Sequence, residues 1–162
     1  MITINRVNKE EKYLLDNLLQ LYLHDISLYF PMDFDSKEGK YIYDDLSKYF
    51  DGSNNYAYLL KDDENIIGFS LVDTTEDNTM VIQEMFILNN YKSKGYGKEI
   101  ATKIFDMHKG NWVVKALPCS PKAENFWKRT IEEYTNNTNE LEYIGKYNRA
   151  VFKFNNEKIP NK

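Results

Sequence analysis

The feature that most constrains the fold is a glycine- and lysine-rich loop between a buried strand and a helix. Residues 79–88 (TMVIQEMFIL) form a nearly continuous apolar run, which predicts a central strand buried on both faces. Gly95 and Gly97 follow, and the apolar residues after them recur at helical spacing. A strand of this kind needs neighbours on both edges and cover on both faces, so we expect a sheet flanked by helices.

Length and composition indicate a single globular domain. The chain has 162 residues, of which 42% are hydrophobic and 28% charged, so intrinsic disorder is excluded. No linker or repeat divides it, and we expect one domain over residues 1–155, with a polar tail over 156–162 that frays. Its 21 basic and 25 acidic residues give a net charge of −4, which disfavours nucleic acid or an anionic membrane as a partner.

Cysteine and histidine are too scarce for a disulfide framework or a metal site. Cys119 is the only cysteine, and His24 and His108 lie far apart in the sequence, so we expect no metal. The first residues resemble a strand more than a signal peptide, and no apolar run approaches a membrane span. We therefore expect a cytoplasmic protein without a membrane partner.

Periodicity and turn residues give an order of elements. Strands are expected over residues 2–7, 56–60, 66–72, 79–88, 112–117, 141–147 and 150–154. Helices are expected after the Asn8–Glu11 capping box, over residues 43–50, between Gly97 and Gly110, and after Ser120–Pro121. The order predicts an α/β protein, with a mixed α+β sheet and helices on its faces.

The loop itself predicts a phosphate site. Glycines allow a close backbone approach, the free N–H groups of the helix's first turn favour an anion, and Lys92, Lys94 and Lys98 add positive charge. It is neither a Walker loop, which would need glycine at 92 and serine or threonine at 99, nor a dinucleotide fingerprint, which would need a small residue at 100.

The spacing basic-x-x-Gly-x-Gly of Lys92, Gly95 and Gly97 resembles the pyrophosphate loop of the GNAT superfamily of N-acetyltransferases. A second match lies in the last expected helix, where that family carries Asn-x-x-Ala-x-x-Phe-Tyr. The corresponding residues here are Ser120, Ala123, Phe126 and Trp127.

Two further segments are similar to a small bacterial subgroup of predicted, uncharacterised acetyltransferases. The first expected helix carries Leu-Tyr-Leu-x-Asp-x-Ser over residues 21–27, and the last ends in Tyr134 and Thr135. The resemblance covers nearly the whole chain and implies a GNAT-like fold, in which two central strands splay apart.

The resemblance implies acetyl-CoA as co-substrate. Its pantetheine arm would lie along the backbone of residues 86–88, and its pyrophosphate on the N–H groups of residues 92–98. A backbone N–H near Ile87 or Leu88 would polarise the acetyl carbonyl. The residues expected to bind CoA are Phe86, Ile87, Leu88, Lys92, Ser93, Lys94, Gly95, Tyr96, Gly97, Lys98, Ser120, Ala123, Phe126 and Trp127.

Acetyl transfer to an amine needs a base, and Glu84 is the candidate. It lies in the apolar strand, where burial would raise its pKa toward neutrality; the alternative is a structural carboxylate paired with a lysine or a backbone N–H. The family's usual acid is a tyrosine, which Trp127 replaces. Tyr134 or a water is left to protonate the thiolate.

In this superfamily the first helices, their loop and the last strand pair shape the acceptor pocket. The residues expected to contact the acceptor are Tyr22, Asp25, Tyr29, Tyr41, Tyr43, Tyr147 and Arg149. Carboxylates beside tyrosines suit a cationic amine of a small molecule, and Arg149 leaves room for an acceptor that also bears a carboxylate. The alternative is that the carboxylates form a solvated acidic surface and that the tyrosines pack in the core.

The resemblance thus implies an acetyl-CoA-dependent N-acetyltransferase of the EC 2.3.1 type, which works by direct attack of a primary amine on the thioester. The alternative is a non-catalytic acyl-CoA-binding or regulatory module, because Ser120 and Trp127 depart from the family pattern. Dimers are common in the superfamily, so a homodimer is a further possibility.

Overall fold

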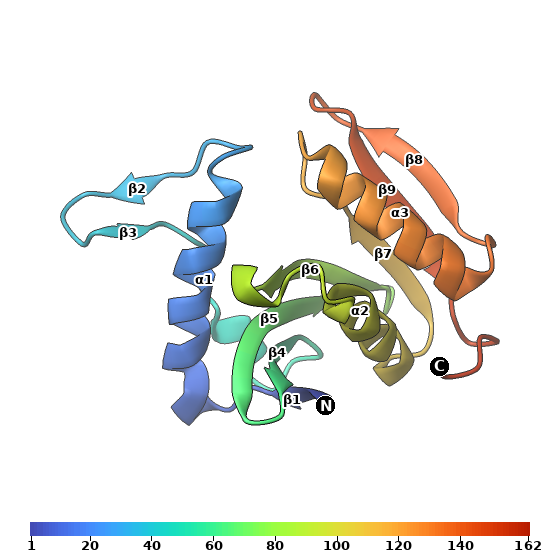
Figure 1. Ribbon diagram of the computed structural model, residues 1–162, viewed down its shortest axis with the longest axis horizontal. Helices are drawn as coiled ribbons and strands as arrows, with labels where there is room; N and C mark the ends of the chain where they lie inside the picture. Colours follow the sequence, from blue (N-terminus) through green and yellow to red (C-terminus); the bar gives the residue numbers. More distant parts are fainter.

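The fold is a seven-stranded sheet with helices on both faces. A computed structural model describes all 162 residues of the chain (Figure 1). The helices are α1 (Lys12–Ile26), α2 (Tyr96–Met107) and α3 (Pro121–Thr135). The strands are β1 (Ile2–Arg6), β2 (Phe34–Asp35), β3 (Lys40–Tyr41), β4 (Tyr56–Asp62), β5 (Asn65–Thr74), β6 (Met80–Ile87), β7 (Asn111–Lys115), β8 (Glu140–Ile144) and β9 (Arg149–Asn155).

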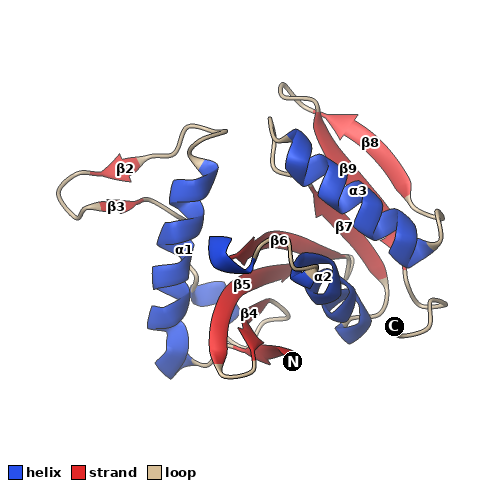
Figure 2. Cartoon of the chain, in the orientation of Figure 1, coloured by secondary structure: helices blue, strands red, loops and turns tan.

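The sheet divides into two antiparallel halves that diverge at their junction. Its strand order is β1-β4-β5-β6-β7-β9-β8, and every neighbouring pair is antiparallel except β6 and β7. Those two strands pair in parallel only from Met80 to Ile82, opposite residues 112–114. A bulge at Gln83 shifts the register against β5 at this point. Beyond it β6 and β7 separate, as Figures 1 and 2 show, which confirms the expected splay.

Each face of the sheet has its own hydrophobic cluster. Alternate residues of β4 show the division, because Ala57 and Leu59 pack in the α1 cluster whereas Tyr58 and Leu60 pack in the other. The larger cluster joins α2 and α3 to the opposite face. The central strands are therefore covered on both sides, as the apolar run of β6 predicted.

Local signals at the helix starts agree with the sequence. Asn8 accepts the N–H of Glu11 at 2.9 Å, and the Glu11 carboxylate accepts the N–H of Asn8, which forms the predicted capping box ahead of α1. Ser120 caps α3 through its Oγ atom, with Pro121 in the first turn.

The expected helix over residues 43–50 is wrong. Only a single 3₁₀ turn forms, from Ser47 to Tyr49, where the Asp45 carboxylate accepts the N–H of Ser47 at 3.0 Å. The apolar residues at 46 and 49 enter the α1 cluster, while Tyr43 reaches toward β6. Their three-residue spacing suggested a helix. An irregular segment whose apolar residues pack on the sheet produces the same spacing.

The polar tail is not free at its start. Asn156 is fully buried, accepts the N–H of Gly110 at 2.8 Å, and donates to the carbonyl of Phe105 at 2.7 Å. Lys162 bonds through Nζ to the carbonyl of Glu133 at 2.9 Å. Asn156 therefore belongs to the folded domain, because buried polar groups at the α2–β7 corner need these partners, and fraying of the exposed residues after it stays a prediction.

Candidate active site

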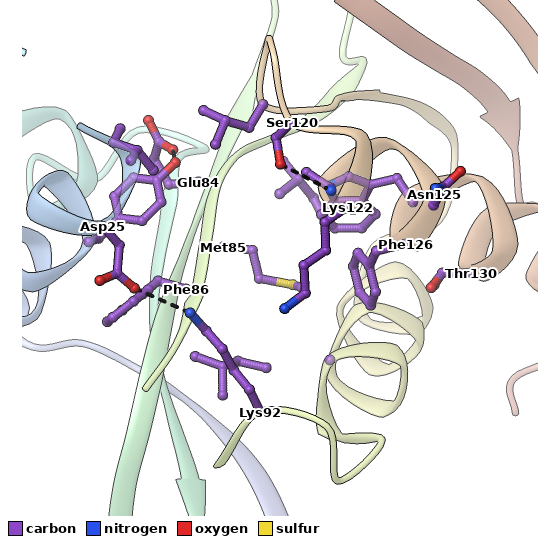
Figure 3. Close-up of a pocket in the computed structure, with 18 of the residues that line it drawn as sticks. Asp25, Glu84, Met85, Phe86, Lys92, Ser120, Lys122, Asn125, Phe126 and Thr130 are labelled. Atoms are coloured by element: carbon purple, nitrogen blue, oxygen red, sulfur yellow. Dashed lines mark hydrogen bonds and ion pairs between the residues drawn. The ribbon is translucent and has the colours of Figure 1, made fainter. Parts of the chain in front are cut away.

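The divergence of β6 and β7 opens a cleft of about 1180 Å³. The end of α1, the strand β6, the glycine loop, the first turn of α2 and most of the length of α3 line it, together with Lys115 of β7 and Arg149 of β9 (Figure 3). Its lining carries six basic side chains and three acidic ones, although the chain as a whole is acidic. These are Lys92, Lys98, Lys115, Lys122, Arg129 and Arg149 against Asp25, Glu84 and Glu133. The cleft therefore favours an anionic ligand.

The glycine loop presents a row of free main-chain donors. Lys92 is the last residue before it whose N–H is bonded, to the carbonyl of Asn89 at 3.2 Å. Bonding resumes at Glu99, whose N–H reaches the carbonyl of Gly95 at 3.3 Å. The six N–H groups of residues 93–98 between them have no protein acceptor. Ser93 and Gly95 have φ of 65° and 82°, a curled backbone that gathers such groups around one point.

Gly97 lets the helices approach closely at this point. A Cβ atom on it would lie 3.0 Å from Cε2 of Phe126 on α3. Phe126 in turn packs edge-on against Trp127, with ring centroids 4.9 Å apart. The two expected motifs, on the loop and on α3, thus meet in one contact. Ser120 and Ala123 also line the cleft. The hydroxyl of Ser120 already accepts the N–H of Ala123 as the cap of α3.

Side chains of the loop are already engaged. Lys92 pairs with Asp25 of α1 at 3.2 Å, and Lys98 pairs with Glu133 of α3. Lys94 lies over the ring of Tyr91, and Tyr96 donates its hydroxyl to Asp62 at 2.8 Å, away from the cleft lining. The side chains of Lys94 and Tyr96 thus lie outside the lining, whereas their backbone N–H groups belong to the free row.

Main-chain donors of β6 also face the cleft. Leu88 donates its N–H to the carbonyl of Ile67 at 2.8 Å, so that group is not free. Antiparallel register alternates, and the N–H groups of Met85 and Ile87 therefore point away from β5, toward the gap that β7 leaves. Of the two expected donors, only Ile87 has the required direction.

Glu84 is held by two tyrosines. Tyr22 of α1 donates to its Oε2 atom, and Tyr43 donates to Oε1 at 3.0 Å. Burial raises the pKa of Glu84 above that of an ordinary glutamate, while these hydrogen bonds and the charge of Arg149 pull it back. Burial and the carboxylate likewise raise the pKa of Tyr22 and of Tyr43, so both remain protonated donors at neutral pH.

Four of the expected acid and acceptor residues do not line the cleft, and one of them, Tyr43, reaches Glu84 from outside the lining. Tyr134 is 2% exposed and donates to Asp106 at 2.8 Å; burial raises its pKa, and it does not line the cleft, so we withdraw it as acid. Tyr41 bonds through its N–H to Gln20 on the far side of α1. Tyr147 packs on Phe30 outside the cleft lining. Among the expected acceptor residues, Tyr22, Asp25, Tyr29 and Arg149 do line it.

Several lining residues escaped the sequence reasoning. Lys122 and Arg129 line the cleft from α3, as does Met85 from β6. A helical signal exists for the first two, because they stand at i and i+7 with Phe126 at i+4, on one face of α3. No comparable signal distinguishes Met85 from any other residue of an apolar strand.

The chain matches a known family in sequence and solved structures in fold. A sequence profile of the acetyltransferase (GNAT) family matches residues 19–131. An acetyltransferase from Thermus thermophilus superposes with a TM-score of 0.69 at 11% identity, over 96% of this chain and 97% of its own. A GNAT-family acetyltransferase from Staphylococcus aureus gives 0.60 at 14% identity, over 96% and 99%.

A third similar structure contains a ligand. NAA60 from Arabidopsis thaliana, in complex with a bisubstrate analogue, gives a TM-score of 0.57 at 12% identity, over 96% of this chain and 98% of its own. These low identities show the fold alone. No curated protein matches the sequence. No helix of this chain combines the length and apolar character needed to cross a membrane.

Proposed function

This chain belongs to the acetyltransferase (GNAT) family, and from that premise we propose that it transfers an acetyl group from acetyl-CoA to a primary amine of a small molecule. The row of free N–H groups over residues 93–98 carries the proposal. It stands at the N-terminus of α2 in a cleft whose basic side chains outnumber its acidic ones, where helix dipole and donors together favour a diphosphate.

The loop accepts the pyrophosphate mainly through its backbone. Lys92 and Lys98 are paired with carboxylates, and each would exchange that partner for a phosphate oxygen. Lys122 and Arg129 add charge from α3, on the side facing the loop. Phe126 and Trp127 supply apolar surface between these groups.

The edge of β6 orients the thioester arm. Its N–H groups at Met85 and Ile87 are the donors that a peptide-like pantetheine chain would pair with, as an added strand would. The N–H of Ile87 is our candidate for stabilising the charge that develops on the acetyl oxygen. Acetyl-CoA supplies the activated acyl group, and the protein positions it beside Glu84.

Glu84 is the proposed base. Its carboxylate takes a proton from the acceptor ammonium, and the neutral nitrogen then attacks the thioester carbon. A C–N bond forms and the C–S bond breaks. The nitrogen then loses its second proton, which passes through water to the CoA sulfur. Burial raises the pKa of Glu84, so its conjugate acid is closer in strength to that of an amine than an exposed glutamate would be.

No side chain is assigned as acid. Trp127 occupies the position of the family's tyrosine and carries no acidic proton. A thiol has an ordinary pKa of about 8.5, so its thiolate leaves readily and can be protonated by water.

Two measurements test the proposal. Calorimetry with CoA and with acetyl-CoA should show binding, and release of free thiol should rise when amines are added. Absence of CoA binding at high micromolar ligand would refute it. Binding without turnover on polyamines, amino acids, aminoglycosides and peptides would favour the acyl-CoA-binding module instead. Light scattering with and without CoA would test the homodimer, which stays a prediction.

A further inference from the structure

Arg149 is an oriented cation on the catalytic side of the cleft. It is the first residue of β9, and its side chain is half-buried. Nε donates to the carbonyl of Ala116 at 2.6 Å, and Nη2 donates to that of Lys115 at 3.4 Å. These two bonds to the end of β7 fix the plane of the guanidinium and leave three of its five N–H donors unused.

This cation has no counter-ion. Lys92 and Lys98 of the glycine loop are each paired with a carboxylate, whereas no carboxylate oxygen lies within ion-pair distance of Arg149. Burial lowers its pKa, which shows that its charge is partly removed from water. A half-buried cation with a fixed fork and free donors is costly unless an anion completes it, and a planar carboxylate matches the geometry of that fork.

Arg149 and Glu84 face the same space without joining. The charge of each stabilises the charged form of the other. The pKa of Tyr22 is raised by the charge of Glu84 and lowered by that of Arg149. Glu84 is already bonded by Tyr22 and Tyr43, so it does not swing onto the guanidinium. Glu84 and Arg149 thus line the same cleft with opposite charges, one from β6 and the other from β9.

We infer that the acceptor is an amino acid, with its ammonium toward Glu84 and its carboxylate on the guanidinium of Arg149. This rests on the proposed acetyl transfer and specifies its substrate class. The phosphate cradle is built from other residues, on the loop and α3, so CoA leaves Arg149 free. Ile26, Leu28 and Tyr29 at the end of α1 line the same cleft, which suits an apolar side chain on the acceptor.

Equilibrium binding tests the inference without requiring turnover. In saturating CoA, calorimetry would compare product-like amides that differ only by a carboxylate. The pairs are N-acetyl-L-leucine with N-(3-methylbutyl)acetamide, and N-acetyl-L-phenylalanine with N-(2-phenylethyl)acetamide. We expect the carboxylate to strengthen binding about tenfold or more in at least one pair, since hydrogen bonds to charged groups are the stronger ones.

Variants assign that preference to one side chain. Arg149→Met should abolish it, and Arg149→Lys should keep only part, because an ammonium lacks the planar fork. Lys128→Met is the matched control, since it removes the same charge from an exposed residue outside the cleft. Unchanged CoA affinity in the Arg149 variants shows that they fold, which guards against loss of the bonds to Ala116 and Lys115.

The two proposals fail in different ways. Binding of CoA with no carboxylate preference in any pair, or a preference that survives Arg149→Met, overturns the amino-acid inference and leaves acetyl transfer standing. Faster thiol release with 3-methylbutylamine than with leucine has the same meaning. If CoA itself does not bind, the proposed function and this inference both fall.

Discussion

The two walls of the cleft are built on different principles. The loop wall offers backbone N–H groups, and its charged side chains are paired at the surface or stack on a ring. The β6 wall offers a side-chain network, in which Tyr22 and Tyr43 both donate to one buried carboxylate. Binding on the first wall should therefore depend on backbone shape, and chemistry on the second should depend on single atoms.

Glu84→Gln breaks the second wall and has the largest expected effect. A general base contributes about 10²–10⁴-fold, so kcat/KM should fall by that order while CoA affinity stays the same. Steady-state thiol release and calorimetry would check both quantities. Glu76→Gln, an exposed carboxylate outside the cleft, is the control. Unchanged kinetics in Glu84→Gln would remove Glu84 as base.

Gly95→Val breaks the first wall. Gly95 has φ of 82°, which a branched residue adopts only with strain, so the row of donors should be displaced. We expect CoA affinity to fall about tenfold to a hundredfold, from lost hydrogen bonds to a charged ligand. Gly52→Val is matched in strain, because Gly52 has φ of 85° and equally open surroundings. Similar losses in both variants would mean general destabilisation.

Tyr22→Phe tests whether Tyr22 sets the pKa of the proposed base, Glu84. Its hydroxyl stabilises the charged form of Glu84, so removing it should raise the pKa of Glu84 further, and the acidic limb of kcat/KM should move up by about one pH unit. A pH profile of thiol release measures this. Tyr41→Phe is the control, since Tyr41 has no bond to Glu84. If the acidic limb stays at the same pH in Tyr22→Phe, Tyr22 does not contact the group whose titration controls activity.

The wild-type profile has a defined sign. As the proposed base, Glu84 must be ionised, so activity should rise with pH through its pKa, which lies above that of an ordinary glutamate. Below that pKa the carboxyl is protonated and accepts no proton. The same limb should be missing from the residual activity of Glu84→Gln.

Asp25→Asn has the smallest expected effect and sharpens the contrast between the walls. Asp25 holds Lys92 at 3.2 Å, and an exposed pair of this kind contributes about 0.2–1 kcal/mol. Releasing Lys92 should tighten CoA binding by about two- to fivefold, and the gain should vanish at high salt. Asp16→Asn breaks the exposed Lys12–Asp16 pair of the same helix and should change nothing. Weaker CoA binding in Asp25→Asn would show that the pair orders the loop.

The sequence was most informative where a function is made by consecutive residues. The apolar run of β6, the glycine spacing and the Ser120–Pro121 helix start are each local, and each predicted its element. The helix predicted around Tyr43 was wrong because the spacing of its apolar residues does not distinguish a helix from an irregular segment that packs on the sheet. Its actual role depends on β6, 41 residues further along.

The side-chain network could be predicted only in part. Glu84 was marked by being an acid in an apolar strand, but its two tyrosine partners are 62 and 41 residues away and carry no local sign. Tyr134 shows the converse, since helical periodicity put it on the inner face of α3 but could not say that its hydroxyl meets Asp106 in the core. The structure was likewise needed to show that the N–H of Leu88 bonds to β5 and that the N–H of Ile87 points toward the cleft.

The buried Asn156 has a consequence for how the chain matures. It locks the corner between α2 and β7, while β9 supplies the whole outer edge of β7. Both lie after all other elements of this domain in the sequence. The half that carries Arg149 must therefore assemble last, onto an N-terminal half of neighbouring hairpins that can form earlier. Ribosome-bound chains stopped before β9 should lose residues 111–148 to limited proteolysis and keep residues 1–107.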